Sequence, residues 1–183
     1  EPREDSLLLC ESIDDAVVKG RSCLDVGCGS GIQSINMSMM GAAKVVAVDV
    51  NGKAVENALH NAKKLGFEKT VTALQSDLFE NVNGKFDVIV FNPPYLESEN
   101  LAERELDGGK KGREVFDRFL EGAEKHLNNN GRIYFLQSSL NGIDETNMKL
   151  KKLGFKVKAI AKKKMFFEEL LVSTSYARSI GMS

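Results

Sequence analysis

The apolar residues of this 183-residue chain fall into two kinds of segment. Short, unbroken runs rich in β-branched residues are typical of strands buried on both faces of a parallel sheet. Segments with an apolar residue every three or four positions are typical of helices with one buried face. One unbroken run, residues 88–91, predicts a buried strand, and less continuous apolar segments predict further strands at residues 22–26, 44–48, 71–75, 132–137, 155–161 and 169–176. Segments with this helical spacing of apolar residues predict helices at residues 5–19, 32–40, 55–65, 116–127 and 144–153.

Strands and helices alternate along most of the chain, and this order predicts an α/β fold with a parallel sheet between two layers of helices. The last two strands are joined by a short loop and must pair as a hairpin, which makes one strand antiparallel. We therefore expect a seven-stranded, mostly parallel sheet. The length suits one domain over residues 1–183, and the sequence shows no internal repeat.

One segment, residues 96–112, fits neither pattern. It has charges of both signs and a glycine cluster at residues 108–112. A connection of this length in a compact domain is often a lid or a binding loop. A plain surface loop is the alternative, and the sequence leaves both open.

Composition narrows the function classes. The 25 basic and 26 acidic residues give a net charge of −1, which argues against a chain built mainly to bind nucleic acid, although a local basic patch is compatible with it. No apolar run approaches the ~20 residues of a membrane span. The three cysteines form no CxxC pair and there are only two histidines, so we expect no metal site. We expect a cytoplasmic protein with reduced, structural cysteines.

The first candidate for chemistry is the turn after the first strand, where Gly27, Gly29 and Gly31 follow Asp25. Glycines allow positive φ and let a ligand approach the backbone, and the N–H groups at the start of the next helix favour an anion. A dinucleotide fingerprint would have a third glycine where Ile32 stands, so the spacing is G-x-G-x-G instead. A tight strand-to-helix connection is the alternative explanation.

Two acids follow the next two strands. Asp49 lies about twenty residues after the glycine turn, where an acid can bind a ribose diol. Asp77 could accept a hydrogen bond from an exocyclic amino group, while Leu78 packs on a flat ring. Helix capping by Asp49 and a simple turn at Asp77 are the alternatives.

The fourth strand ends in Asn92-Pro93-Pro94-Tyr95. The prolines fix φ and lack N–H groups, so this tip is stiff and its oxygens are available to a ligand. The Asn92 side chain and the Pro93 carbonyl can accept the hydrogens of a planar NH2 group, and Tyr95 can stack on its face. Taken alone, the motif is equally consistent with a turn.

Together these segments resemble the class I methyltransferases, which have a Rossmann-like fold and use S-adenosylmethionine. Residues 1–6 and 108–114 further resemble the archaeal and eukaryotic branch of the HemK family, which methylates the glutamine of the Gly-Gly-Gln motif in class I peptide release factors. The resemblance implies a cofactor pocket and a substrate site. The implied cofactor residues are Ser6, Asp25, Gly27, Gly29, Gly31, Asp49, Asp77, Leu78 and Asn92. The implied catalytic residues are Asn92, Pro93, Pro94 and Tyr95, with Asn92 and Pro93 holding the substrate amide.

The same resemblance implies a small zinc-ribbon activator subunit as a partner. We expect it at the strand of residues 70–75, an edge strand in the family that here carries neither charge nor proline. Lysines protect the opposite edge. The alternatives are a nucleic-acid adenine or guanine methyltransferase, a protein lysine methyltransferase, and a non-catalytic subunit. We expect no added recognition domain, and the net charge is not positive. Both points argue against a nucleic-acid substrate.

Overall fold

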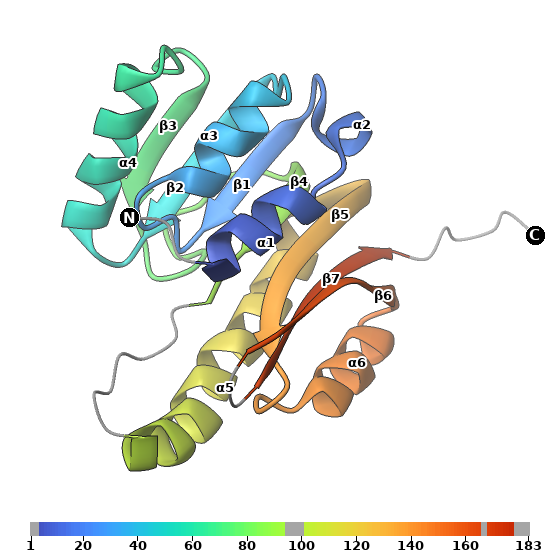
Figure 1. Ribbon diagram of the computed structural model, residues 1–183. Coiled ribbons are helices and arrows are strands. Elements are labelled where there is room, and N and C mark those ends of the chain that lie inside the picture. The colour runs from blue at the N-terminus through green and yellow to red at the C-terminus, as the bar shows by residue number, and fades with distance from the viewer. Residues whose placement is uncertain (1–3, 94–100, 166–167, 178–183) are drawn as a thin grey trace, which may run out of the picture.

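The computed structural model describes residues 4–93, 101–165 and 168–177, and these residues form a seven-stranded sheet with the strand order β3-β2-β1-β4-β5-β7-β6 (Figure 1). The strands are β1 (Ser22–Val26), β2 (Lys44–Asp49), β3 (Val71–Gln75), β4 (Phe86–Phe91), β5 (Leu127–Ser138), β6 (Phe155–Lys164) and β7 (Glu169–Ala177). The helices are α1 (Glu4–Ser12), α2 (Asp15–Val18), α3 (Ile32–Met39), α4 (Gly52–Lys64), α5 (Leu101–His126) and α6 (Ile143–Lys152).

The sheet has the predicted arrangement. Strands β3, β2, β1, β4 and β5 run parallel, and β7 pairs antiparallel with both β5 and β6. The last two strands form the expected hairpin, and β7 is the single strand of opposite direction. Because five parallel strands end at the same edge, the residues that follow β1, β2, β3 and β4 are brought to one side of the sheet.

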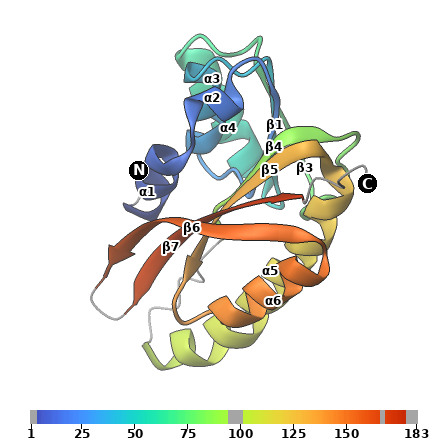
Figure 2. The same ribbon diagram turned by 90° about the vertical axis from the view of Figure 1, so that its right-hand side faces the viewer.

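Helices cover both faces of the sheet, as Figure 2 shows from the side. Helices α1 to α4 pack on one face over a core that includes Leu9, Met37 and Val90. Helices α5 and α6 pack on the other face, over a core that includes Phe91, Phe119 and Phe135. Phe91 and Phe119 stack with ring centroids 4.2 Å apart, which fixes α5 against the end of β4. No helix in the described part of the chain is long and apolar enough to cross a membrane.

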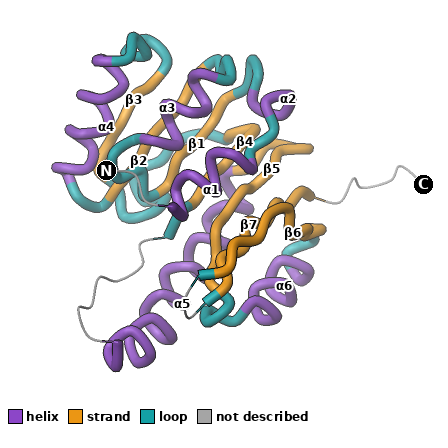
Figure 3. The backbone as a smooth tube through the Cα atoms, viewed as in Figure 1, coloured by secondary structure: helices purple, strands orange, loops and turns teal. Residues whose placement is uncertain are grey.

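The sequence-based prediction was wrong about the first helix. One helix was expected up to Gly20, but the chain forms two, α1 and α2, with a short link visible in Figure 3. The Asp14 side chain accepts a hydrogen bond from the Ala16 N–H and caps α2. Aspartate is among the preferred residues at the N-terminal cap of a helix, so Asp14 starts α2 and the predicted single helix is divided there.

The long segment was also predicted incorrectly. Residues 94–100 lie outside the described part, but α5 already begins at Leu101 and continues through residues 108–112. Most of the predicted loop is therefore the first half of a long helix. Residues 101–106 are leucine, alanine, glutamate and arginine, which are strong helix formers. Their propensity outweighs the cost of the glycines that follow.

Candidate functional site

The glycine turn after β1 is a fixed backbone loop at the carboxyl edge of the sheet. Gly27, Gly29 and Gly31 all have positive φ, at 66°, 51° and 80°. The Cys28 N–H donates to the Val48 carbonyl oxygen of β2 at 2.9 Å, which ties the turn to the neighbouring strand. The conformation itself requires glycine at these positions.

Two of these glycines face different surroundings. A Cβ placed on Gly29 would meet no atom within 4 Å, so the backbone there borders open space. A Cβ on Gly31 would lie 2.9 Å from the Cα and Cβ atoms of Ala58. Gly31 therefore lets α4 approach the turn, whereas Gly29 leaves room for a ligand.

Asp25 lies under the turn and is 1% exposed. Its Oδ2 atom accepts hydrogen bonds from the Ser34 N–H at 3.0 Å and the Ser34 hydroxyl at 2.6 Å. Burial raises the pKa of Asp25 to about 7; the Ser34 hydrogen bonds lower it and the nearby Asp49 charge raises it further. The structure thus places Asp25 as an anchor of α3, behind the loop that faces the site.

Asp49, at the end of β2, points at the glycine turn. Its Oδ2 accepts from the Gly29 N–H at 3.0 Å, and its Oδ1 accepts from the Asn51 N–H at 2.9 Å. A carboxylate has about four acceptor positions, so it can still accept from a diol. The glycine turn and Asp49 therefore lie in direct contact at the carboxyl edge of the sheet.

Asp77 and Leu78 lie at the end of β3, and their turn has a strained backbone. Leu78 has φ 50°, which is uncommon for a residue other than glycine. Ser76, which is 2% exposed, holds the turn: its hydroxyl donates to the Leu78 carbonyl and accepts from the Asn81 N–H. The sequence analysis missed Ser76, although serine beside a turn is a usual signal for such bonds.

The Asp77 carboxylate is paired with α5. Its Oδ2 lies 2.9 Å from a guanidinium nitrogen of Arg118, and both side chains are about half exposed. Such a pair stabilises little, so it leaves the carboxylate available to another donor. Asp77 and Leu78 line a shallow cleft of about 320 Å³ between this turn and α5.

Asn92 follows β4 and has the least expected surroundings. Its Nδ2 group donates to the Asp5 Oδ2 at 3.2 Å and to the Ser6 Oγ at 3.1 Å, both on α1. Its Oδ1 is buried and has no hydrogen-bond donor among the described residues. A buried carbonyl oxygen without a donor is costly, and such atoms often mark a position that a ligand fills. Pro93 follows directly, while the predicted Pro94 and Tyr95 lie outside the described residues.

Helix α1 is held firmly where it meets Asn92. The Gln33 side chain, on α3, donates to the Ser6 carbonyl at 2.8 Å and accepts from the Cys10 thiol at 3.3 Å. Asn36 donates to the Cys10 carbonyl at 3.1 Å. No sequence signal pointed to Gln33, because its importance depends on contacts between distant segments.

A family model identifies the chain. Residues 4–167 match the family described as methyltransferase small domain. The chain belongs to this family. The match covers most of the sheet and every described residue of the predicted site, so the predicted enzyme class is confirmed.

Two relatives show which kind of methyltransferase the chain resembles. A protein of Methanocaldococcus jannaschii named as a candidate protein N5-glutamine methyltransferase is 46% identical over 182 residues, 96% of this chain and 90% of its own. The release factor glutamine methyltransferase of Borreliella burgdorferi is 33% identical over 123 residues, 62% of this chain and 43% of its own. These names agree with the predicted resemblance to the HemK family.

A solved structure confirms the predicted fold. The Mtq2–Trm112 complex of E. cuniculi, described as responsible for methylation of the eRF1 translation termination factor, superposes with a TM-score of 0.74 at 24% identity. The superposition covers 97% of both chains. At this identity the likeness shows the fold.

The cysteines of this methyltransferase are unsuited to nucleophilic catalysis. Cys10, Cys23 and Cys28 are free thiols. Burial raises the pKa of Cys10 and of Cys23 to about 12 and also raises that of Cys28, so all three stay protonated at neutral pH. Among the described residues, no group of three or more His, Cys, Asp or Glu side chains could hold a metal ion.

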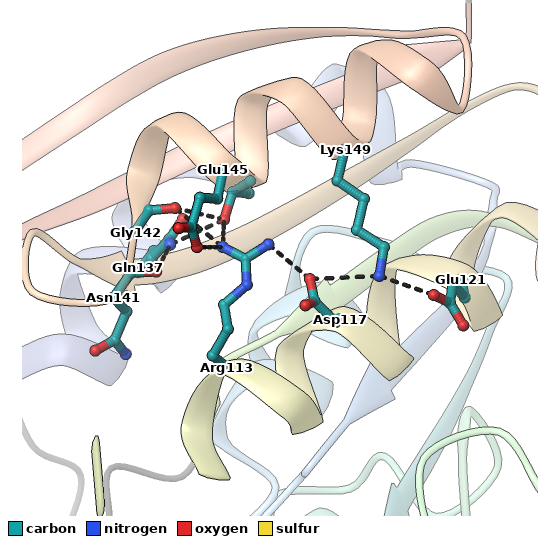
Figure 4. A network of polar contacts seen from close by, with 9 residues as sticks. Arg113, Asp117, Glu121, Gln137, Asn141, Gly142, Glu145 and Lys149 are labelled. Carbon is teal, nitrogen blue, oxygen red and sulfur yellow. Dashed lines mark hydrogen bonds and ion pairs between the residues drawn. The ribbon is translucent and has the colours of Figure 1, made fainter. Parts of the chain in front are cut away.

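A polar network fixes α5 to α6 (Figure 4). The Arg113 guanidinium donates to the Gly142 carbonyl at 3.0 Å, to the Thr146 hydroxyl at 2.9 Å and to Asp117 at 2.6 Å. Lys149 of α6 lies 3.4 Å from the same Asp117 carboxylate. Gly142 belongs to the turn that follows β5, so the network fixes a loop at the same edge of the sheet as Asn92.

Proposed function

We propose that this protein transfers a methyl group from S-adenosylmethionine to the side-chain amide nitrogen of a protein glutamine. The observation that carries the proposal is the buried Asn92 Oδ1, which has no donor among the described residues and lies at the carboxyl edge of β4. Such an oxygen suits a planar NH2 group. The name of the M. jannaschii relative supports glutamine as the methylated residue.

The proposed substrate is the Gly-Gly-Gln motif of a class I peptide release factor. Support comes from the B. burgdorferi relative and from the E. cuniculi complex, whose names refer to release or termination factors. The free thiols of the chain agree with a reducing, cytoplasmic location, where such factors work.

The residues of the glycine turn fit the cofactor. Open space at Gly29 leaves room for a ligand against the backbone, and the N–H groups at the start of α3 favour its carboxylate. We assign the ribose hydroxyls to Asp49, whose carboxylate lies beside the Gly29 N–H, and the adenine to Asp77 and Leu78 at the end of the neighbouring strand. Ser6 and Gly27 border the same edge, while Asp25 and Gly31 support the turn from behind.

The chemistry follows from the substrate. Bound S-adenosylmethionine supplies an electrophilic methyl group on a sulfonium. An amide nitrogen is a poor nucleophile because its lone pair is delocalised. When Asn92 Oδ1 and the Pro93 carbonyl accept its two hydrogens, they orient the NH2 group and increase its electron density. The protein therefore acts mainly by positioning and preorganised dipoles.

Transfer of labelled methyl groups tests the substrate class. We expect label from S-adenosylmethionine in a purified release factor, and no label when the glutamine of its Gly-Gly-Gln motif is replaced. DNA, RNA and a lysine-rich histone are assayed in parallel. Labelling of nucleic acid alone, or of the release factor after the glutamine is replaced, would overturn the proposal.

The Asn92→Ala variant tests the role of the carbonyl oxygen. We expect turnover to fall by about 10²–10³, the usual loss for one preorganised polar contact, while most of the cofactor affinity is kept. Calorimetry measures the affinity and single-turnover transfer measures the rate. Near-normal turnover would show that Asn92 is only a turn residue.

We also propose a small zinc-ribbon partner at the edge of β3, over residues 70–75. Among the described strands, β3 pairs only with β2 and forms one edge of the sheet, and Thr72 and Gln75 are exposed. The other edge, β6, carries exposed Lys156 and Lys158, which discourage strand addition. With the partner added, amides of residues 71–75 should become protected from hydrogen exchange. Unchanged exchange there, with binding demonstrated elsewhere, would refute this site.

A further inference from the structure

We infer that Asp5 is a positioning residue, which fixes the orientation of the Asn92 amide so that Oδ1 faces the substrate. The inference rests on the proposed function for its consequence in catalysis, but its structural part can be tested separately. The sequence analysis gave Asp5 no role in the site, although residues 1–6 carried part of the family resemblance. It reaches the site only because α1 packs beside the end of β4 (Figure 1).

An asparagine side chain has a nearly symmetrical shape and can rotate by 180° about its last bond. Its hydrogen-bond partners therefore decide which atom points into a site. Here the Asp5 Oδ2 lies 3.2 Å from the Asn92 Nδ2. A carboxylate only accepts hydrogen bonds, so the rotated amide would place two oxygens against each other. Asp5 therefore excludes the orientation in which Nδ2, a donor, would face the donor groups of the substrate.

The second contact cannot supply this selectivity. The Ser6 hydroxyl lies 3.1 Å from the Asn92 Nδ2 and can either accept or donate. Because this hydroxyl donates its hydrogen to the Asp5 Oδ1 at 3.4 Å, Asp5 makes it an acceptor toward Asn92; without Asp5 it would bind either end of the amide. The choice of orientation therefore depends on the charged neighbour, Asp5.

Asp5 also changes the electron distribution of the amide. A charge-assisted hydrogen bond to Nδ2 polarises the amide and places more negative charge on Oδ1. Methyl transfer to a neutral amide nitrogen develops positive charge on that nitrogen before its proton leaves. A more negative Oδ1, with the Asp5 carboxylate behind it, stabilises this charge. The effect is expressed in turnover and not in cofactor binding.

The fixed position of α1 makes this arrangement effective. Gln33 binds the Ser6 carbonyl at 2.8 Å, and Asn36 binds the Cys10 carbonyl at 3.1 Å. Leu9 is fully buried in the core. Asp5 is thus presented by a helix that is held at three points, as a positioning group must be.

A double-mutant cycle tests the inference. We expect Asp5→Asn to lower kcat about 10- to 50-fold with unchanged affinity for S-adenosylmethionine, because the amide introduced by this change can also donate and no longer excludes the rotated Asn92 side chain. In the Asn92→Ala background the same change should alter kcat less than about twofold, since Asp5 acts through Asn92.

Glu4→Gln is the matched control, because it removes the neighbouring carboxylate of the same helix. The Glu4 carboxylate lies 3.0 Å from the Lys163 ammonium group of β6 in an exposed ion pair, and such pairs stabilise little. In this control kcat should stay within about twofold of the parent value. An additive loss in the double mutant would overturn the inference, because it would show that Asp5 acts only by supporting α1. An unchanged kcat in Asp5→Asn would overturn it as well.

A spectroscopic measurement tests the contact without any substrate. In ¹⁵N NMR spectra, the side-chain NH2 resonances of Asn92 should shift in Asp5→Asn and stay in place in Glu4→Gln. If these resonances do not move in Asp5→Asn, the contact is absent and the inference fails. If they shift while no glutamine substrate is methylated, the positioning role stands and the proposed function fails.

Discussion

The contrast between Gly31 and Gly29 allows a quantitative prediction, because the same substitution meets different surroundings at the two positions. Alanine at Gly31 must adopt a φ near 80°, which costs about 1–2 kcal/mol for a residue with a Cβ. Its Cβ would also lie 2.9 Å from the Ala58 Cα, well inside a normal carbon contact of about 3.5–4.0 Å. Backbone atoms of α4 must move, and overpacking of this kind costs about 1–3 kcal/mol.

We therefore expect Gly31→Ala to lower the free energy of unfolding by about 2–5 kcal/mol. Gly29→Ala has the same backbone cost at φ 51° but no clash, so its loss should be about 1–2 kcal/mol. For cofactor binding the ranking should reverse: Gly29→Ala should lower the affinity for S-adenosylmethionine more than Gly31→Ala does, because the new methyl group at Gly29 fills the open space beside the loop.

Urea unfolding followed by circular dichroism measures both stabilities, which suits a chain without tryptophan. Calorimetry with S-adenosylmethionine, without urea and at a temperature where both variants are folded, measures affinity. Equal losses of stability in the two variants would refute the reasoning about Ala58. An unchanged affinity in Gly29→Ala would refute the placement of the cofactor beside that loop.

Three further predictions concern charged side chains held by hydrogen bonds. The pKa of Asp25 is raised to about 7 in the folded chain, so the parent loses stability as this carboxyl ionises between about pH 4 and 7. Asp25→Asn should therefore gain stability relative to the parent over this range, by at most ~4 kcal/mol, and no further above pH 7. Urea unfolding at several pH values measures this difference. Asp87→Ala should cost about 1–3 kcal/mol at pH 7, because the Asp87 carboxylate accepts hydrogen bonds from the Ser22 N–H and hydroxyl. Burial raises the pKa of Asp87, but these bonds hold it below its usual value, so the loss of stability should shrink in acid. Arg113→Ala should cost about 2–3 kcal/mol in thermal unfolding, because three acceptors each lose one donor and the α5–α6 network loses its centre. The half-exposed Arg118→Ala should cost less than about 1 kcal/mol.

The fold was largely predictable because short apolar segments, with the unbroken run of residues 88–91 among them, alternate with helical stripes along the chain. Strands β1 and β3 have the predicted boundaries, and the β6–β7 hairpin follows from the short loop between them. A run buried on both faces has one plausible structure in a domain of this length, so local sequence and overall fold agree there.

Helix boundaries were harder, since a helix can continue or stop at small energetic cost. At Asp14, one capping bond to the Ala16 N–H was enough to divide a helix that apolar spacing alone would continue. At Leu101, propensity extended α5 beyond the apolar stripe that was used to predict it. Both errors come from competition between effects of about 1 kcal/mol each.

In the candidate site, too, local features could be predicted from the sequence, whereas contacts between distant segments could not. The glycine turn and Asp49 could be predicted because parallel strands end at one edge, and the Gly29–Asp49 bond confirms their proximity. The contact between Asp5 and Asn92 joins residues 87 positions apart and depends on how α1 lies across the sheet. Motif spacing contains no information on that packing. The sequence thus locates the oxygen that can receive a substrate amide, but only the tertiary structure shows what orients it.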